Sequence, residues 1–128
     1  MYIVKKANVD LQSVVINTEN VEYNKANERY EYVVPNGNKP NVVITAVNLN
    51  QTVQLLDEYG KVLATGTGSI TTTLTLDAIT LNNDYIIKVI SHNGETLGFK
   101  EYKLNIRQKS IEDRNNVYQS RWLRNVVK

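Results

Sequence analysis

Apolar and polar residues alternate along most of the chain between residues 10 and 107, and this period of two predicts β-strands. In the segment 69–76, Ile70, Leu74 and Leu76 share one face, while threonines occupy most of the other. A strand of this kind packs its apolar face against a core and leaves the opposite face in water.

Two further segments, 85–89 and 102–106, alternate in the same way and are predicted to form a hairpin. Their connection contains Asn93-Gly94, a dipeptide that suits the positive backbone angles of a tight turn. Five more segments are rich in Val, Ile, Thr or Tyr and are bounded by turn residues: 11–17, 30–34, 41–47, 52–56 and 61–65. Short strands without a helical period between them predict an all-β domain, in which about seven to eight strands form two packed antiparallel sheets.

The chain changes character after residue 108. Ser110 precedes Asp113 at the spacing of a helix N-terminal capping box, and apolar residues then recur near a helical period with arginines between them. We expect a short amphipathic helix or arm here, which either folds back on its own sandwich or projects into another subunit. In the second case the partner-binding residues are Arg114, Tyr118, Arg121, Trp122, Arg124 and Val126.

Charge is divided unevenly along the chain. Residues 1–106 carry nine basic and eleven acidic side chains, whereas residues 107–128 carry six basic and two acidic ones. A basic tail on a mildly acidic body favours an anionic partner or an acidic patch on a neighbouring subunit, but it is no sign of sequence-specific nucleic-acid binding. The expected organisation is an N-terminal arm or extra strand over 1–9, a sandwich domain over 10–107 and a basic helix or arm over 108–128.

The stretch from residue 11 to residue 106 resembles a known family of β-sandwich domains. The resemblance rests on the opening strand at 11–16, the run Tyr30-Glu31-Tyr32-Val33-Val34-Pro35-Asn36-Gly37, the strand at 42–46 and the closing segment 95–106. These segments are similar to the cadherin-like β-sandwich domain of bacterial surface and secreted proteins, a branch of the immunoglobulin-like group. The resemblance implies an immunoglobulin-like antiparallel sandwich that serves as a spacer or an adhesive module, and it carries over no catalytic residue.

Candidate catalytic and metal-binding residues are few among the 128 residues. The chain has no cysteine and one histidine, His92, which precedes the Asn93-Gly94 turn and is expected to be an exposed turn residue. Transition metals need several His or Cys ligands, and the runs Asn82-Asn83-Asp84 and Asp57-Glu58 lack the carboxylate spacing of a calcium loop. We therefore expect no catalytic residue, no cofactor and no metal site.

Four other residues have specific expectations. Tyr85, at the entry to its strand, has the placement of a tyrosine corner. Tyr30 and Tyr32 are candidates for an aromatic platform under a sugar, but they share a face with Val34, and this favours core packing. Asn105 is expected on the hydrated face of its strand, which argues against an internal Lys–Asn amide crosslink.

These features favour a non-enzymatic structural or interaction protein. The first hypothesis is a building block of a phage virion, whether capsid-decorating, head-to-tail or tail-associated, bound to protein subunits of a larger assembly that includes copies of itself. The alternatives are an adhesive or spacer module of a Gram-positive surface protein, located at the cell surface or secreted, and a carbohydrate-binding module with a glycan ligand. No membrane partner is expected, because no apolar run has the length of a membrane span.

Overall fold

The computed structural model describes residues 6–35, 37–76 and 82–108, and these residues form ten strands and no helix. The strands are β1 (Leu11–Ile16), β2 (Glu19–Asn20), β3 (Tyr23–Asn24), β4 (Arg29–Val34), β5 (Asn41–Ala46), β6 (Thr52–Asp57), β7 (Val62–Thr67), β8 (Ser69–Thr73), β9 (Asn82–Ile90) and β10 (Phe99–Gln108). The helix expected after residue 108 lies outside the described residues.

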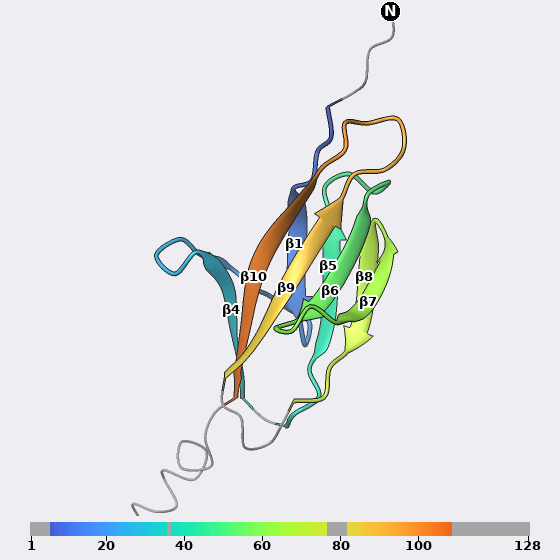
Figure 1. Ribbon diagram of the computed structural model, residues 1–128. Coiled ribbons are helices and arrows are strands. Elements are labelled where there is room, and N and C mark those ends of the chain that lie inside the picture. The colour runs from blue at the N-terminus through green and yellow to red at the C-terminus, as the bar shows by residue number, and fades with distance from the viewer. Residues whose placement is uncertain (1–5, 36, 77–81, 109–128) are drawn as a thin grey trace, which may run out of the picture.

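The strands build two sheets that face each other across the core (Figure 1). A four-stranded sheet has the order β2-β1-β5-β8, and a six-stranded sheet has the order β3-β4-β10-β9-β6-β7. The predicted all-β sandwich is confirmed.

Two details of that prediction need correction. The described residues contain ten strands rather than seven or eight, because β2 and β3 have two residues each and are too short to show a periodic pattern. The sheets are also not wholly antiparallel, since β4 runs parallel to β10, with Tyr30 opposite Leu104 and Tyr32 opposite Ile106. Alternation gives no signal for strand direction, because a strand alternates in the same way whichever way its neighbour runs.

The predicted hairpin of β9 and β10 is confirmed. The two strands pair antiparallel over all of β9 and over Phe99–Arg107 of β10, with Tyr85 opposite Leu104 and Ile87 opposite Tyr102. The connection is longer than a two-residue turn, because the N–H of Ser91 donates to the carbonyl of Gly98 at 2.9 Å. The Asn93-Gly94 dipeptide lies inside this loop, where Gly94 has a φ of 92°.

The core lies between the sheets and is filled from the faces that the alternation predicted. Side chains exposed by 1% or less include Ile16 and Ile44 from the four-stranded sheet, and Leu55, Ile87 and Leu104 from the six-stranded sheet. Burial of each such side chain stabilises the fold by about 1.5–3 kcal/mol, so this layer is the main source of stability.

The chain crosses from one sheet to the other at Gly68, between β7 and β8. Gly68 has a φ of 78°, and a Cβ at this position would lie 2.5 Å from the carbonyl oxygen of Leu49. Its N–H donates to the carbonyl of Gln51 at 2.7 Å, and its own carbonyl accepts from Ala46 at 2.9 Å. Only glycine combines this backbone angle with so close an approach.

Candidate interaction surface

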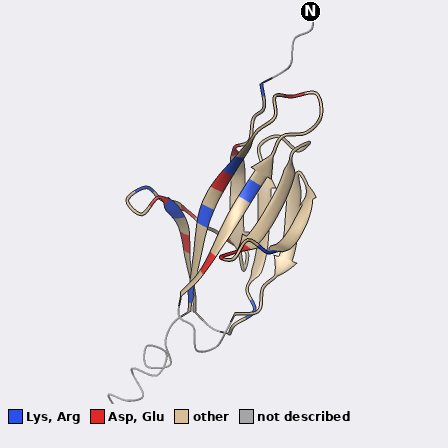
Figure 2. Ribbon diagram, in the orientation of Figure 1, with Lys and Arg blue, Asp and Glu red and all other residues tan. Residues whose placement is uncertain are grey.

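The outer faces of the two sheets differ in charge. The three longer strands of the four-stranded sheet, β1, β5 and β8, contain no Lys, Arg, Asp or Glu. Figure 2 shows that charged residues instead gather on β4, β9 and β10 of the six-stranded sheet. One outer face of the sandwich is therefore almost free of charge, and the other is strongly hydrated.

The uncharged side has a regular arrangement across its strands. Val15, Val43 and Thr71 stand opposite one another in one row, and the next row joins Thr45 to Ser69. The two valines are half-buried, while Thr71 is exposed. We call this surface the uncharged face, and its outward residues are Ser13, Val15, Asn41, Val43, Thr45, Ser69, Thr71 and Thr73.

On the opposite side, the charged residues of the six-stranded sheet bond to one another. Arg29 and Glu31 form an ion pair at 3.1 Å. A hydrogen bond from Asn27 lowers the pKa of the Glu31 carboxyl, and hydrogen bonds from Arg29 and Asn24 act in the same direction. Glu31 is thus held ionised as an acceptor at the base of the loop between β3 and β4.

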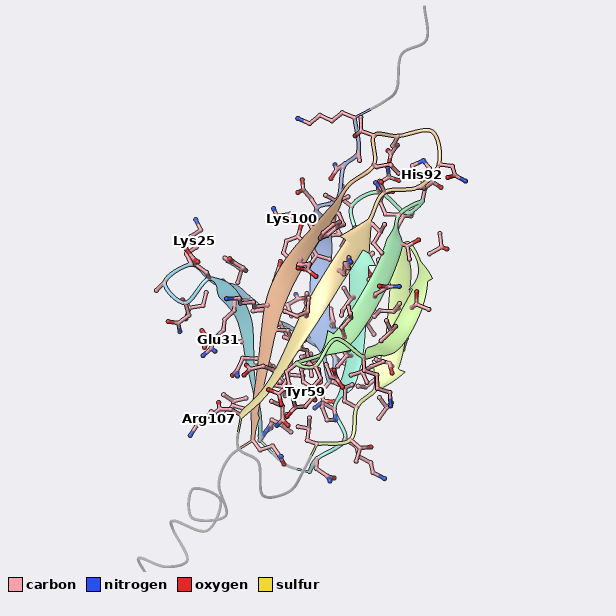
Figure 3. The ribbon with its side chains drawn as sticks, in the orientation of Figure 1. Lys25, Glu31, Tyr59, His92, Lys100 and Arg107 are labelled. Carbon is pink, nitrogen blue, oxygen red and sulfur yellow. The ribbon has the colours of Figure 1, made fainter. Side chains whose placement is uncertain are left out.

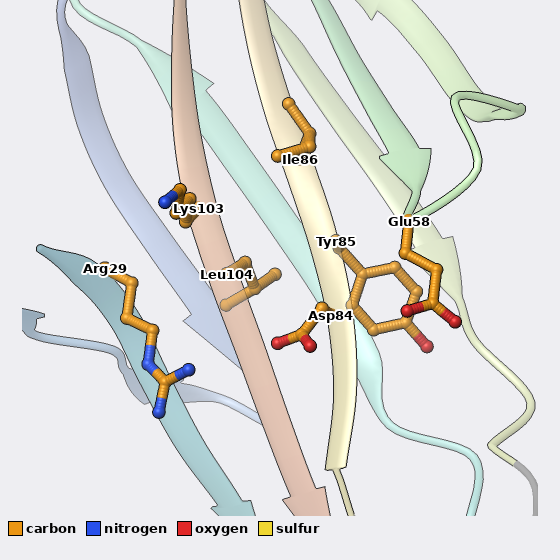
Figure 4. A pocket seen from close by; sticks show the side chains of 7 residues that line it. All are labelled: Arg29, Glu58, Asp84, Tyr85, Ile86, Lys103 and Leu104. Atoms are coloured by element: carbon orange, nitrogen blue, oxygen red, sulfur yellow. The ribbon is translucent and has the colours of Figure 1, made fainter. Parts of the chain in front are cut away.

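A surface concavity of about 320 Å³ lies beside this ion pair. Its border brings together Arg29 from β4, Lys103 from β10 and Asp84 from β9 (Figure 4). The charges are of both signs and stand beside aliphatic side chains such as Ile86. A border with both positive and negative side chains favours neither an anionic nor a cationic ligand.

The expectation that Asn105 is hydrated is wrong. The residue is 5% exposed, and its Nδ2 donates to Asp84 Oδ1 at 2.8 Å. Asn105 lies on β10 in the interior of the six-stranded sheet, directly between Glu31 of β4 and Asp84 of β9. These two side chains flank it in the same row, which explains how an outward residue becomes buried.

The expectation for His92 also needs correction, because its ring belongs to a polar cluster at the end of the sandwich (Figure 3). Its Nδ1 lies 2.8 Å from Gln51 Oε1 and 3.0 Å from Glu95 Oε1. Gln51 Oε1 also accepts from the His92 N–H at 2.9 Å, so it is an acceptor and His92 Nδ1 carries the hydrogen. The His92 side chain is 31% exposed, whereas that of Glu95 is 1% exposed.

Gln51 holds this cluster together. It is fully buried, and its Nε2 donates to Glu95 Oε1 at 2.8 Å and to the carbonyl of Asn8 at 2.7 Å. Asn48 Nδ2 adds a donor to Glu95 Oε2 at 3.3 Å. All the partners belong to loops or to the N-terminal segment, so the cluster ties the connections at this end of the sandwich to each other.

Asp57 has a similar structural role in the β6–β7 turn. Its Oδ1 accepts from the N–H groups of Tyr59 and Lys61, each at 2.9 Å, and so stabilises this turn. Across residues 6–35, 37–76 and 82–108, no three His, Cys, Asp or Glu side chains converge in a way that would hold a metal ion.

Tyrosines gather at a second concavity, of about 420 Å³, next to the part of β10 that β4 does not reach. The rings of Tyr23 and Tyr30 meet edge to face with centroids 5.1 Å apart, and Tyr30 meets Tyr102 at 6.3 Å. The hydroxyl of Tyr102 donates to the carbonyl of Val9 at 2.8 Å, and burial raises its pKa to about 12. The N-terminal segment is thereby fixed beside this cluster.

The tyrosine cluster differs from the aromatic pair considered in the sequence. Tyr32 is 8% exposed and belongs to the core, as its shared face with Val34 indicated. Tyr30 is half-buried and lines the concavity together with Tyr23 and Tyr102. The sequence could not bring these three together, because they meet only through the pairing of β3 with β4 and of β4 with β10.

Two sets of expectations fall on residues outside those described. The six candidate partner-binding residues between Arg114 and Val126 belong to the first set. Tyr85 is buried at the start of β9, as a tyrosine corner requires, but the chain just before that strand, residues 77–81, is also outside the description.

Comparison of the chain with known proteins gave no match to a family, to a curated protein or to a solved structure. None of the described residues belongs to a helix with the length and apolar character needed to cross a membrane.

Proposed function

We propose that the chain is a non-enzymatic building block of a larger protein assembly, and that this assembly is a phage virion. The observation that carries the proposal is the uncharged face. The centres of protein interfaces are depleted of charged residues, and the face has Val15 and Val43 at its middle with hydroxyl and amide side chains around them. The choice of a virion follows from fold-level analogy, because sandwiches of this general class are frequent in such particles.

The polar cluster around Gln51 supports a non-enzymatic role. The one histidine of the chain and the buried carboxylate of Glu95 are both bonded to Gln51, which fixes their positions within the loops. These bonds satisfy His92 Nδ1 and both oxygens of Glu95 without a substrate. Here the imidazole Nδ1 and Glu95 Oε1 serve to hold the loops in place.

We expect particles purified from the source of this chain to contain it at a fixed copy number, measured by quantitative mass spectrometry. Val43→Lys places a charge in the middle of the uncharged face and should reduce that copy number at least about tenfold, since a charge desolvated in an interface costs several kcal/mol. Ile86→Lys, at a half-buried outward position of the charged sheet, is the matched control and should leave it unchanged.

Circular dichroism of both variants checks that the sandwich still folds. Recovery of the chain in the cell envelope and its absence from particles would contradict the virion proposal and favour an adhesive or spacer module. Equal incorporation of the two lysine variants would show that the uncharged face is not the docking surface.

A carbohydrate-binding module is the second candidate, and the tyrosine cluster favours it. Tyr23 is 44% exposed, so part of its ring is open to a sugar. Glu28, Glu101 and Lys103 border the same concavity and supply acceptors and donors for hydroxyl groups. The charges of both signs suit a neutral glycan.

The glycan hypothesis predicts that Tyr23→Ala weakens binding at least about tenfold, since truncation of an aromatic contact in a binding site costs on the order of 2 kcal/mol. Binding to a glycan array, followed by titration calorimetry of the best ligand, measures the effect. Tyr59→Ala is the control, because Tyr59 is 88% exposed in a different turn. The hypothesis fails if the unaltered chain binds no glycan or if both variants lose affinity equally.

A further inference from the structure

The free strand edges of the described residues are not equally protected. A free edge offers unpaired N–H and C=O groups to another chain, and proteins usually block it with short strands, bulges or charges. The edge strand β2 of the four-stranded sheet and the edge strand β3 of the six-stranded sheet have only two residues each. The free part of β10, Phe99–Lys103, includes three charged residues. β7 contains a register shift where it pairs with Leu55 and Leu56.

β8 has none of these protective features. Its five residues, Ser69–Thr73, include no charge, proline or glycine, and their pairing with β5 is regular throughout. Among the described strands β8 pairs with β5 alone, so its other edge is unpaired, although at its start the carbonyl oxygen of Ser69 lies close to Gly66 of β7. This edge also borders the uncharged face.

The hydrogen bonds at the two ends of β8 show which backbone groups point to the free edge. The N–H of Leu74 donates to Pro40 at 3.0 Å, and the carbonyl of Gly68 accepts from Ala46 at 2.9 Å. Because bonded residues alternate along an antiparallel pair, Ile70 and Thr72 also bond to β5. Ser69, Thr71 and Thr73 therefore direct their N–H and C=O groups away from β5.

We propose that β8 pairs antiparallel with β8 of a second copy of this chain, around a two-fold axis at Thr71. Thr71 then faces Thr71 of the second copy, and Ser69 faces Thr73 on either side. Because the Ser69 carbonyl lies close to Gly66, the pairing allows about four backbone hydrogen bonds, two between the Thr71 residues and one from each Ser69 N–H to the opposite Thr73 carbonyl. The pairing joins the two four-stranded sheets, and thus the two uncharged faces, into one continuous sheet. The inference rests on the proposed function, because it names one partner of that surface.

A second copy suits this edge because the strand is complementary to itself. The outward side chains at Ser69, Thr71 and Thr73 are all small hydroxyl groups, and Thr–Thr and Thr–Ser pairs across strands are favourable. No charge meets a like charge in the pairing. A strand pair of this length covers less than the roughly 800 Å² per partner of a standard stable interface, so we expect a dimer that dissociates on dilution.

Cysteine crosslinking tests the register directly, because the chain has no cysteine of its own. In a hydrogen-bonded pair the Cα atoms lie about 5.5 Å apart, within disulfide range, so Thr71→Cys should form a disulfide-linked dimer under mild oxidation. Thr73→Cys is the matched control: it is equally exposed, but its counterpart on the second copy lies four residues further along the strand. We expect at least a tenfold faster crosslinking of Thr71→Cys, and equal rates would overturn the proposed register.

Sedimentation velocity over a wide concentration range tests the association itself. The unaltered chain should form dimers as its concentration rises. Thr71→Pro removes an N–H that β5 does not use and should yield monomers, whereas Thr71→Val keeps this donor and should still dimerise. If the proline variant does not fold, Thr71→Lys serves instead, since it sets like charges against each other at the axis.

If the unaltered chain stays monomeric at every concentration, the proposed pairing of β8 with a second copy is wrong. The proposed function is still supported in that case if Val43→Lys lowers the copy number of the chain in purified particles. The two failures are therefore distinguishable.

Discussion

Replacement of Gln51 with leucine should lower the free energy of unfolding by about 3–5 kcal/mol. The leucine removes one amide donor from the buried Glu95 carboxylate and the donor to the carbonyl of Asn8, and it leaves the backbone N–H of His92 without its acceptor. Each unsatisfied buried polar group costs about 1–3 kcal/mol. For a domain of this size the melting temperature should fall by more than about 10 °C. Urea unfolding followed by circular dichroism, together with calorimetry, measures both quantities.

Gln12→Leu is the matched control for this prediction. Gln12 is exposed on β1, so the same substitution there should change stability by less than about 0.5 kcal/mol. Similar losses in the two variants would mean that the cluster of Gln51, His92 and Glu95 does not stabilise the loops.

A second large effect is expected for Gly68→Ala, which should destabilise the fold by about 3 kcal/mol. Alanine at a positive φ is strained, and here its Cβ would also lie 2.5 Å from the carbonyl oxygen of Leu49, so the backbone itself has to shift. Thermal unfolding, monitored by circular dichroism, gives the size of the loss.

Gly60→Ala separates the two causes. Gly60 has a φ of 89°, but no atom lies within 4 Å of the position that a Cβ would take. The substitution should therefore cost only the strain of the backbone angle, about 1 kcal/mol. If Gly68→Ala lowers the free energy of unfolding no more than Gly60→Ala does, the close approach of Leu49 to Gly68 does not contribute to the effect.

Most strands could be predicted from the sequence because the alternation of apolar and polar residues lies within each segment. Ile70, Ile87 and Leu104 are buried on the faces that the period of two assigned to them. No comparable local pattern indicates which strands pair with each other. The parallel pairing of β4 with β10 joins residues far apart in the chain, and nothing local distinguishes it from an antiparallel pair.

For the candidate surfaces too, the sequence shows the local composition but not which segments lie together. Segments 11–16, 41–46 and 69–73 can be read as uncharged directly from the sequence, but only the topology shows that they share one sheet. Gln51 follows Asn48, Leu49 and Asn50 in a stretch that reads as a turn, so no local signal marks its side chain as buried. Its partners, Glu95 and the carbonyl of Asn8, come from distant parts of the chain.

The course of the strands has a mechanical consequence. The N-terminal segment enters at one end of the sandwich and β10 finishes at the other (Figure 1). Tension applied between these two points acts along β1 and β10, and so tends to slide them lengthwise past β5 and β9. In such a shear geometry the hydrogen bonds of a strand share the force and yield together, whereas in peeling they would open one by one. Pulling on these two points should therefore load the strands in shear rather than peel them apart.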